Sequence, residues 1–179
     1  MNDLSLTRLW AMRGAFLLLT LVILFFQLLP LDTTPRQWAG PDLLICFACA
    51  WSLRRPEYVP AASLALAFLL SDLLLQRPPG LWALLALLGC ENIKSRGRTL
   101  RDASFATEWL TIGTIIVLIT LAERLGLALA LAPVPSLTLS LSELVMTLLF
   151  YPLIVAVTHW LMGVRKTAPG DLDARGQRV

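Results

Sequence analysis

The chain has 179 residues, 57% of them hydrophobic, and its mean hydropathy is +0.72. Because soluble domains contain about 45–50% apolar residues, this composition excludes most soluble enzymes and binding domains. The net charge is +3, but the basic residues lie in short loops beside apolar runs, which argues against a nucleic-acid-binding face. The length accommodates about six membrane spans and leaves no room for a separate soluble domain.

The apolar runs predict an all-α integral membrane protein with six transmembrane helices in a single domain, residues 1–164. Pro41 suits a first helical turn, and Asp42 lies near the positive end of the same helix. Spans two to four are short for a bilayer of ~30 Å, so they need snorkelling arginines, local thinning or shelter among neighbouring helices. Residues 165–179 are expected to form a disordered cytoplasmic tail. The expected spans cover residues 14–31, 41–53, 60–75, 81–93, 103–132 and 142–164.

The basic residues are unevenly divided between the expected loops. With six spans and a cytoplasmic N-terminus, all but Arg36, Arg77 and Arg124 of the 15 Lys and Arg residues lie inside. The positive-inside rule therefore predicts a bacterial inner-membrane protein with both termini in the cytoplasm. No small-residue cleavage pattern follows the first apolar run, so we expect an uncleaved first helix.

Asp72 is the most deeply embedded of the expected carboxylates. It follows Ser63, Ala67 and Ser71, small residues spaced four apart that permit close helix packing. An intramembrane carboxylate has three interpretations here: a contact with water, Arg77 or a neighbouring helix end; a partner contact; or ion transport. Asp42, Asp72 and Arg77 could also share one polar network between helices.

The sequence predicts no catalytic, cofactor-binding or metal-binding residue. The Cys46-x-x-Cys49 pair and Cys90 lie inside apolar runs without a second pair or a nearby histidine. His159 is the only histidine, so it cannot build a metal site. No serine lies in a recognisable nucleophile motif for which it could act as the general base. An intramembrane enzyme is therefore the least favoured class.

Two further groups of residues are expected at the membrane surfaces. Arg54 and Arg55, and the basic loop 94–102, face the cytoplasm, where they set topology and contact anionic lipid, or dock a cytoplasmic partner. The tryptophans near span ends are expected to be interfacial anchors. These are Trp10, Trp38, Trp82, Trp109 and Trp160.

The segment from Gly40 to Leu88 contains four short motifs in a characteristic order: Pro41-Asp42; Trp51-Ser-Leu-Arg-Arg-Pro56; Leu70-Ser-Asp72-Leu-Leu; and Arg77-Pro-Pro-Gly80-Leu-Trp-Ala-Leu. This segment resembles the MreD family of rod shape-determining proteins, and the chain's size and expected span number agree with that family. One departure is the absence of the glycine that the family typically carries before the aspartate of span three. Ala67 and Ser71 occupy that neighbourhood here.

The resemblance implies a non-catalytic scaffold subunit of the cell-elongation machinery, which supports rod shape and lateral peptidoglycan synthesis. Its implied partners are MreC, RodA with its penicillin-binding transpeptidase, and the actin-like MreB, within the lipid bilayer and without nucleic acid. The implied fold is similar to the substrate-binding subunits of energy-coupling-factor transporters. The resemblance assigns Asp42, Arg55 and Asp72 to fold integrity and partner contact, and Arg54 is a further polar position in the same turn.

A second function stays open from another class of protein. The chain could be a membrane subunit that captures a small vitamin-type molecule for a transporter. Such a subunit needs an outward-facing pocket, and Trp38, Asp42 and Trp82 are the obvious material for one.

Overall fold

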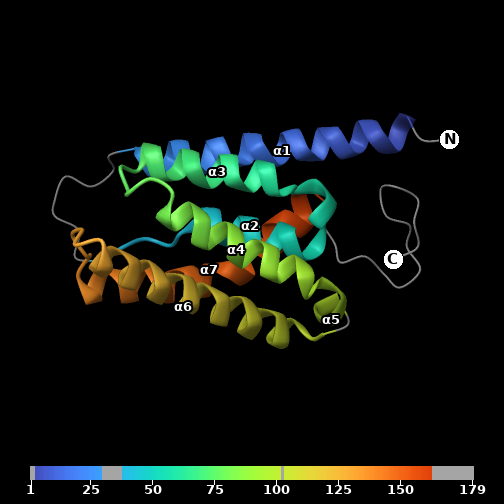
Figure 1. The fold of residues 1–179 in the computed structure, drawn as a ribbon. Coiled ribbons are helices and arrows are strands. Elements are labelled where there is room, and N and C mark those ends of the chain that lie inside the picture. Colours follow the sequence, from blue (N-terminus) through green and yellow to red (C-terminus); the bar gives the residue numbers. More distant parts are fainter. Residues whose placement is uncertain (1–2, 30–37, 102, 163–179) are drawn as a thin grey trace.

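The computed structural model describes residues 3–29, 38–101 and 103–162, and every regular element in these residues is helical. The all-α prediction is thus confirmed for this part of the chain (Figure 1). The predicted tail 165–179 lies outside the described residues. The elements are α1 (Asp3–Leu28), α2 (Leu43–Arg54), the 3₁₀ turn η1 (Pro56–Tyr58), α3 (Ala61–Leu74), α4 (Leu81–Ser95), α5 (Gly97–Arg101), α6 (Phe105–Leu129) and α7 (Leu137–Met162).

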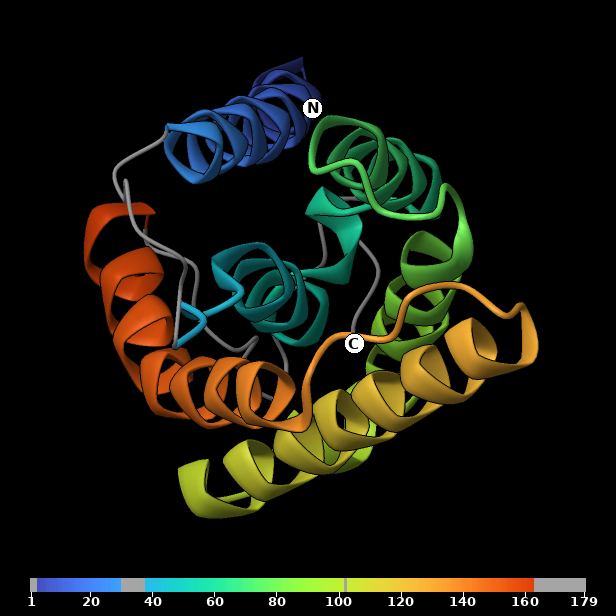
Figure 2. The same ribbon diagram turned by 90° about the vertical axis from the view of Figure 1, so that its left-hand side faces the viewer.

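The short helix α2 lies at the centre of the bundle. Every residue from Leu44 to Arg54 is buried, and α1, α3, α4, α6 and α7 are arranged around it (Figure 2). Apart from Ser52 and Arg54, the α2 side chains are apolar or small on all sides, which is the pattern of a fully enclosed helix. Aromatic packing joins it to α1, since the Phe16 and Phe47 rings stack with centroids 5.2 Å apart.

Three helices of the described residues are long and apolar enough to cross a membrane: Leu6–Leu28, Phe105–Leu129 and Leu137–Trp160. Their outward faces expose many large apolar side chains. Exposure of so much apolar surface is unfavourable in water and favourable in lipid. The shorter helices α2 and α3 are apolar as well, and α2 is covered by its neighbours. The exposed side chains include Leu18, Leu21 and Phe25 on α1, Leu110, Leu118 and Leu121 on α6, and Leu141, Val145 and Leu149 on α7.

Several helix ends differ from the expected span limits. α1 begins at Asp3, well before residue 14, and α7 begins at Leu137, before residue 142. The basic loop expected at 94–102 contains the last turn of α4 and the short helix α5. A helix is not obliged to stop at the membrane surface, so hydropathy locates the span better than the helix ends.

A proline inside α7 is compensated by a side chain from α6. Pro152 has no N–H, so it cannot donate the helical hydrogen bond to the Leu148 carbonyl. The indole Nε1 of Trp109 donates to that carbonyl instead, at 3.0 Å. Trp109 is therefore an interhelical hydrogen-bond donor, in addition to any contact it makes with the membrane interface.

Candidate functional site

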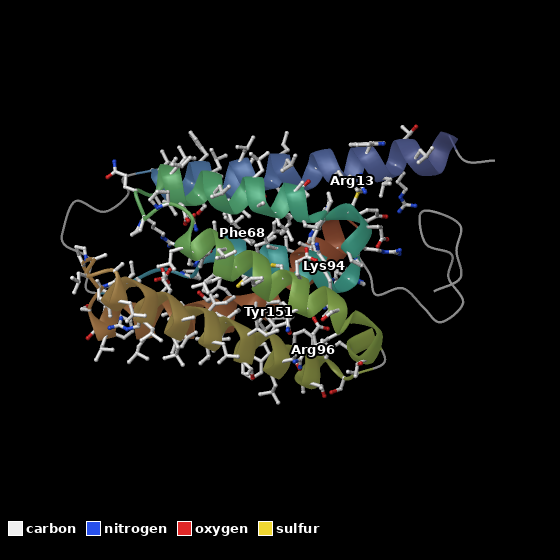
Figure 3. All side chains as sticks on the ribbon, in the orientation of Figure 1. Arg13, Phe68, Lys94, Arg96 and Tyr151 are labelled. Carbon is white, nitrogen blue, oxygen red and sulfur yellow. The ribbon has the colours of Figure 1, made fainter. Side chains whose placement is uncertain are left out.

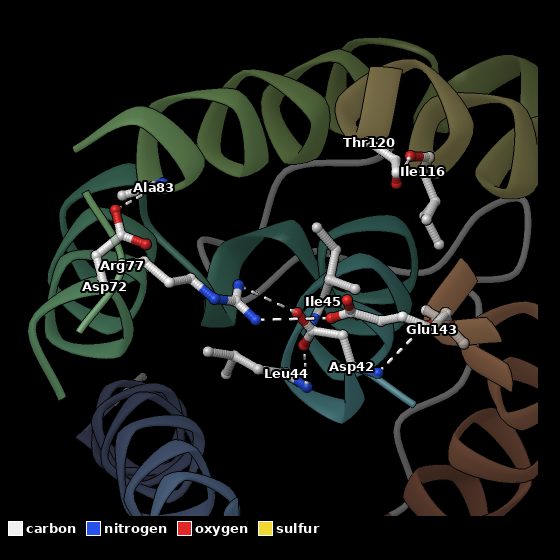
Figure 4. A network of polar contacts seen from close by, with 10 residues as sticks. Asp42, Leu44, Ile45, Asp72, Arg77, Ala83, Ile116, Thr120 and Glu143 are labelled. Carbon is white, nitrogen blue, oxygen red and sulfur yellow. Dashed lines mark hydrogen bonds and ion pairs between the residues drawn. The ribbon is translucent and has the colours of Figure 1, made fainter. Parts of the chain in front are cut away.

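Polar side chains from three parts of the chain meet at the end of the bundle where α1 ends and α4 begins. We call Asp42, Arg77, Glu143 and Thr147 the outer polar network (Figure 4). Asp42 precedes α2, Arg77 lies between α3 and α4, and Glu143 and Thr147 belong to α7. The network therefore joins three separate regions of the bundle.

Asp42 organises the start of α2. Its Oδ1 accepts hydrogen bonds from the backbone amides of Leu44 at 3.1 Å and Ile45 at 3.2 Å, as an N-cap residue does. Its own backbone amide donates to the Thr147 hydroxyl at 2.9 Å, and that hydroxyl donates to the Glu143 carbonyl at 2.6 Å. One aspartate thus caps α2 and attaches it to α7.

Arg77 spans the gap between these elements. Its Nη1 lies 3.8 Å from Asp42 Oδ2, and its Nη2 lies 3.6 Å from Glu143 Oε1. The guanidinium also lies over the Trp82 ring, with Cζ 4.9 Å from the ring centroid, a cation–π arrangement. The sequence-based suggestion that Asp42 and Arg77 share a network agrees with this geometry.

Trp82 was expected to anchor the protein at the membrane interface, and this is wrong. Its side chain is 5% exposed and packs edge-to-face on Phe68, with ring centroids 5.2 Å apart. The reason is tertiary: α4 packs against α3, and Trp82 lies on the side of α4 that meets Phe68. Trp10, Trp38 and Trp160 are largely exposed, which suits the predicted interfacial role.

Asp72 does not join the outer polar network through its carboxylate. Its Oδ2 accepts from the backbone amides of Gly80 at 2.8 Å and Ala83 at 3.2 Å. Gly80, at φ +93°, is the N-cap of α4 and has no side chain to cap the helix, so Asp72 supplies the acceptor from α3. Of the three interpretations of Asp72, the contact with a neighbouring helix end is the one that this geometry realises.

The small residues that precede Asp72 face the interior to different degrees. Ala67 and Ser71 are buried, whereas Ser63 is half-buried. This places the predicted packing stripe along the inner side of α3, where it meets the other helices. A bulky side chain at the buried Ala67 or Ser71 would overfill this interface.

A second buried cluster lies at the opposite end of α2. Arg54 Nη2 lies 2.7 Å from Glu108 Oε1, and Tyr151 donates its hydroxyl proton to the same carboxylate oxygen at 2.7 Å. Glu108 is 0% exposed and Arg54 is 6% exposed, so the pair is desolvated. Removing one partner from a buried pair of this kind destabilises a protein by about 3–5 kcal/mol, since the other charge stays buried.

The cluster of Arg54, Glu108 and Tyr151 corrects the expectation for Arg54 and adds Glu108 to the buried polar residues. The Arg54 side chain does not face the cytoplasm to dock a partner, because Glu108 holds it inside the bundle. Arg55 remains partly exposed and pairs with Glu57 at 3.4 Å. The role of Glu108 was not predicted because it lies near a span end, where a carboxylate is ordinarily solvated. The available signal was Arg54, a charged residue in an apolar helix that needs a buried partner of opposite charge.

The turn after α2 is fastened on both sides. Arg13 Nε on α1 donates to the Glu57 carbonyl at 3.2 Å, and Lys94 Nζ on α4 donates to the Val59 carbonyl at 2.6 Å. Figure 3 shows Arg13, Lys94 and Arg96 at the same end of the bundle. Two of these three basic side chains therefore hold the turn in place, besides any role in topology.

A cavity of about 250 Å³ opens beside the outer polar network. Three carboxylates and two guanidinium groups line it, together with Trp82 and apolar side chains of α6. Trp38, which was expected to contribute to an outer pocket, is not among its described lining residues and is 69% exposed. The charged lining groups are Asp42, Glu123, Glu143, Arg77 and Arg124.

Within the described residues, no three His, Cys, Asp or Glu side chains come together in a way that could hold a metal ion. Cys46, Cys49 and Cys90 are buried free thiols, and the Cys46 thiol donates to the Thr147 carbonyl at 3.2 Å. Comparison with protein families, with curated proteins and with solved structures finds no match for this chain.

Proposed function

We propose that this protein is a non-catalytic scaffold subunit of the bacterial cell-elongation machinery. The observation that carries the proposal is where the motif residues of the resemblance lie. Asp42 is distant in the sequence from the segment that carries Asp72, Arg77, Gly80 and Trp82, yet these residues cap, pair and pack at one end of the bundle. Each of these motif residues therefore has a structural role in this bundle, which is what the proposal needs of them.

The use of the polar groups favours a structural subunit over a catalytic one. Asp42, Asp72, Arg54 and Glu108 all bond to backbone or side-chain groups of other elements. These contacts fix the helices relative to one another. A rigid bundle with large apolar outer faces is suited to holding a partner's transmembrane segment, for which packing is the main attraction inside lipid.

Six spans are the proposed topology, with both termini in the cytoplasm of the inner membrane. α1 begins and α7 ends at the same end of the bundle (Figure 1), which is also the end of Arg13, Lys94 and Arg96 (Figure 3). This distribution supports the positive-inside assignment. The short helices α2, α3 and α4 would cross only because longer helices shelter them.

The proposed partners follow from the resemblance. MreC would pair with the bundle in the membrane, and RodA, its transpeptidase and MreB would be reached through that pair. The fold would be similar to that of the energy-coupling-factor substrate-binding subunits. Asp42, Arg54 and Asp72 would act in this function by fixing the bundle, whereas Arg55, which is partly exposed and pairs with Glu57, would meet a partner or a lipid headgroup.

Depletion of the protein from the bacterium that carries it tests the proposal. We expect rod-shaped cells to widen and become round, since lateral wall synthesis would lose its scaffold. Wild-type protein and the Ala62→Leu variant, which alters an exposed position of α3, should restore the rods. Ser71→Leu, which overfills a buried position of the same helix, should restore them poorly. Unchanged shape and wall growth on depletion would contradict the proposal.

One observation favours the second function, a subunit that captures a small molecule. The cavity beside the outer polar network lies at the expected outer end and contains polar groups and Trp82. Its volume of about 250 Å³ is below the ~300–1,000 Å³ of most small-ligand sites. A vitamin-sized molecule retained through purification, and lost in an Arg77→Ala variant, would favour this function over the scaffold.

A further inference from the structure

A second, larger hollow lies on the side of the bundle, between α4 and α6. We call it the α4–α6 groove; its volume is about 450 Å³. The α4 side chains that line it follow a helical repeat from Leu85 to Arg96, and those of α6 run from Thr111 to Ala122. The groove is therefore a channel along two antiparallel helices, separate from the outer polar network.

The walls of the groove offer almost no free hydrogen-bonding groups. Thr111 and Thr114 line it, but each hydroxyl donates to a carbonyl of its own helix, Thr107 and Leu110 respectively, at 2.8 Å. The remaining wall consists mainly of Leu and Ile side chains, and Gly89 forms part of the floor. A hydrogen-bonding occupant would find few free groups here, whereas a hydrocarbon chain would make dispersion contacts along the whole length.

The close approach of α4 and α6 at Gly89 depends on the absence of a side chain. A Cβ at this position would lie 2.7 Å from Ile119 Cδ1 and 3.1 Å from Ile115 Cγ2. The glycine therefore lets α4 and α6 approach closely beneath the groove, and the larger side chains around it form the walls.

One end of the groove is polar and positively charged. Arg96 and Asn92 line this end, and both are exposed. Among the described residues, the Arg96 side chain has no hydrogen-bond or ion-pair partner, in contrast to Lys94, which contacts Glu91 and Val59. An anion at this end would therefore meet an uncommitted guanidinium.

The length of the groove matches one leaflet of a bilayer. Leu85 and Arg96 are about 17 Å apart along the α4 axis at 1.5 Å per residue. Half of a hydrocarbon core of ~30 Å is about 15 Å. An occupant with an anionic group at Arg96 and an apolar chain ending near Leu85 would thus fill the groove from interface to midplane.

We propose that the α4–α6 groove binds an anionic phospholipid, with one acyl chain between the helices and the phosphate against Arg96. In the proposed topology this lipid comes from the cytoplasmic leaflet, which carries anionic headgroups. Binding itself requires only that Arg96 lies at a membrane interface, so it does not depend on the scaffold function. The bound lipid covers the seam between α4 and α6 and adds to the packing of the bundle.

Native mass spectrometry of the delipidated full-length protein in detergent measures this binding. Phosphatidylglycerol and phosphatidylcholine with the same acyl chains are added separately and the bound molecules are counted. We expect one phosphatidylglycerol to bind more tightly than phosphatidylcholine. Equal retention of the two lipids would overturn the assignment of an anionic headgroup.

Two variants with matched controls locate the site. Arg96→Gln should weaken phosphatidylglycerol binding about fivefold, the effect of one basic residue near an anionic surface, and leave phosphatidylcholine unchanged. Arg8→Gln removes a charge from another exposed position, on α1, and should change neither. Thr114→Phe fills the groove and should abolish tight phosphatidylglycerol binding. Its control, Leu110→Phe, enlarges an exposed α6 side chain outside the groove and should leave the binding unchanged.

The same measurements can reject the proposal. If Arg96→Gln and Thr114→Phe bind phosphatidylglycerol as the wild type does, the groove is not the lipid site. If the protein binds no phospholipid but Thr114→Phe loses a co-purifying membrane protein, the groove holds a partner's helix. All four variants change exposed or half-buried positions, and unchanged melting temperatures would show that each is folded.

Discussion

The carboxylate of Asp72 accepts the backbone amides of Gly80 and Ala83, so a residue of α3 caps the start of α4. Asp72→Ala leaves both amides without this acceptor inside a low-dielectric bundle. We expect the free energy of unfolding to fall by about 1–3 kcal/mol, and by less for Asp72→Asn, which keeps one carbonyl oxygen. Denaturant titration in detergent micelles measures the change.

A matched control separates this capping role from a general effect of charge. Glu91→Ala removes a more exposed carboxylate that pairs with Lys94 on α4, and we expect a change within about 0.5 kcal/mol. Equal losses from Asp72→Ala and Glu91→Ala would contradict the capping role.

Trp109 and Pro152 form a pair whose energies should not add. Trp109→Phe removes the donor to the Leu148 carbonyl, with an expected loss of about 1 kcal/mol beyond the loss of packing. In the Pro152→Ala background, the new amide can donate to Leu148, so the same substitution should lose less. A double-mutant cycle measures this coupling, and strictly additive effects would refute it.

At the level of single residues, the sequence predicted some of these roles and missed others. Asp42 beside a helix start is a local signal, because a cap depends on neighbours in the sequence. Glu108 could not be assigned from local sequence, because its burial depends on Arg54 and Tyr151, which other helices supply. Trp82 was misassigned for the same reason: an aromatic residue near a span end has the same sequence signature whether it faces lipid or core.

At the scale of the element, α3 packs through small residues on one side. Ser71→Leu inserts a large side chain at a position that is 1% exposed, and overpacking of this kind destabilises by about 1–3 kcal/mol. Ala62→Leu, at an exposed position of the same helix, should have little effect. Thermal unfolding in detergent distinguishes the two, and equal melting temperatures would show that α3 is loosely packed at Ser71.

The helices were easier to predict than their arrangement. Apolar runs identify α1, α6 and α7 because each is long enough for hydropathy alone to define it. The central position of α2 was not predicted, although its lack of a polar face indicates burial on all sides. Helix α5 was missed because five residues between two longer helices carry no periodicity.

At the scale of the whole molecule, the positive-inside assignment predicts on which side each end of the bundle lies. Thr99 on α5 and Thr138 on α7 are exposed, and the three native cysteines are buried. A thiol reagent that cannot cross membranes should label Thr138→Cys in right-side-out spheroplasts, and Thr99→Cys only after permeabilisation. The reverse order would invert the topology and move the outer polar network to the cytoplasm.

The proposed scaffold depends on which proteins surround the bundle in its own membrane. Affinity purification after gentle crosslinking in native membranes, followed by mass spectrometry, tests this most directly, with an unrelated tagged inner-membrane protein as the control. We predict recovery of a bitopic MreC-type partner together with RodA and its transpeptidase. Recovery of ATP-binding-cassette subunits instead would contradict the scaffold function and identify a transporter subunit.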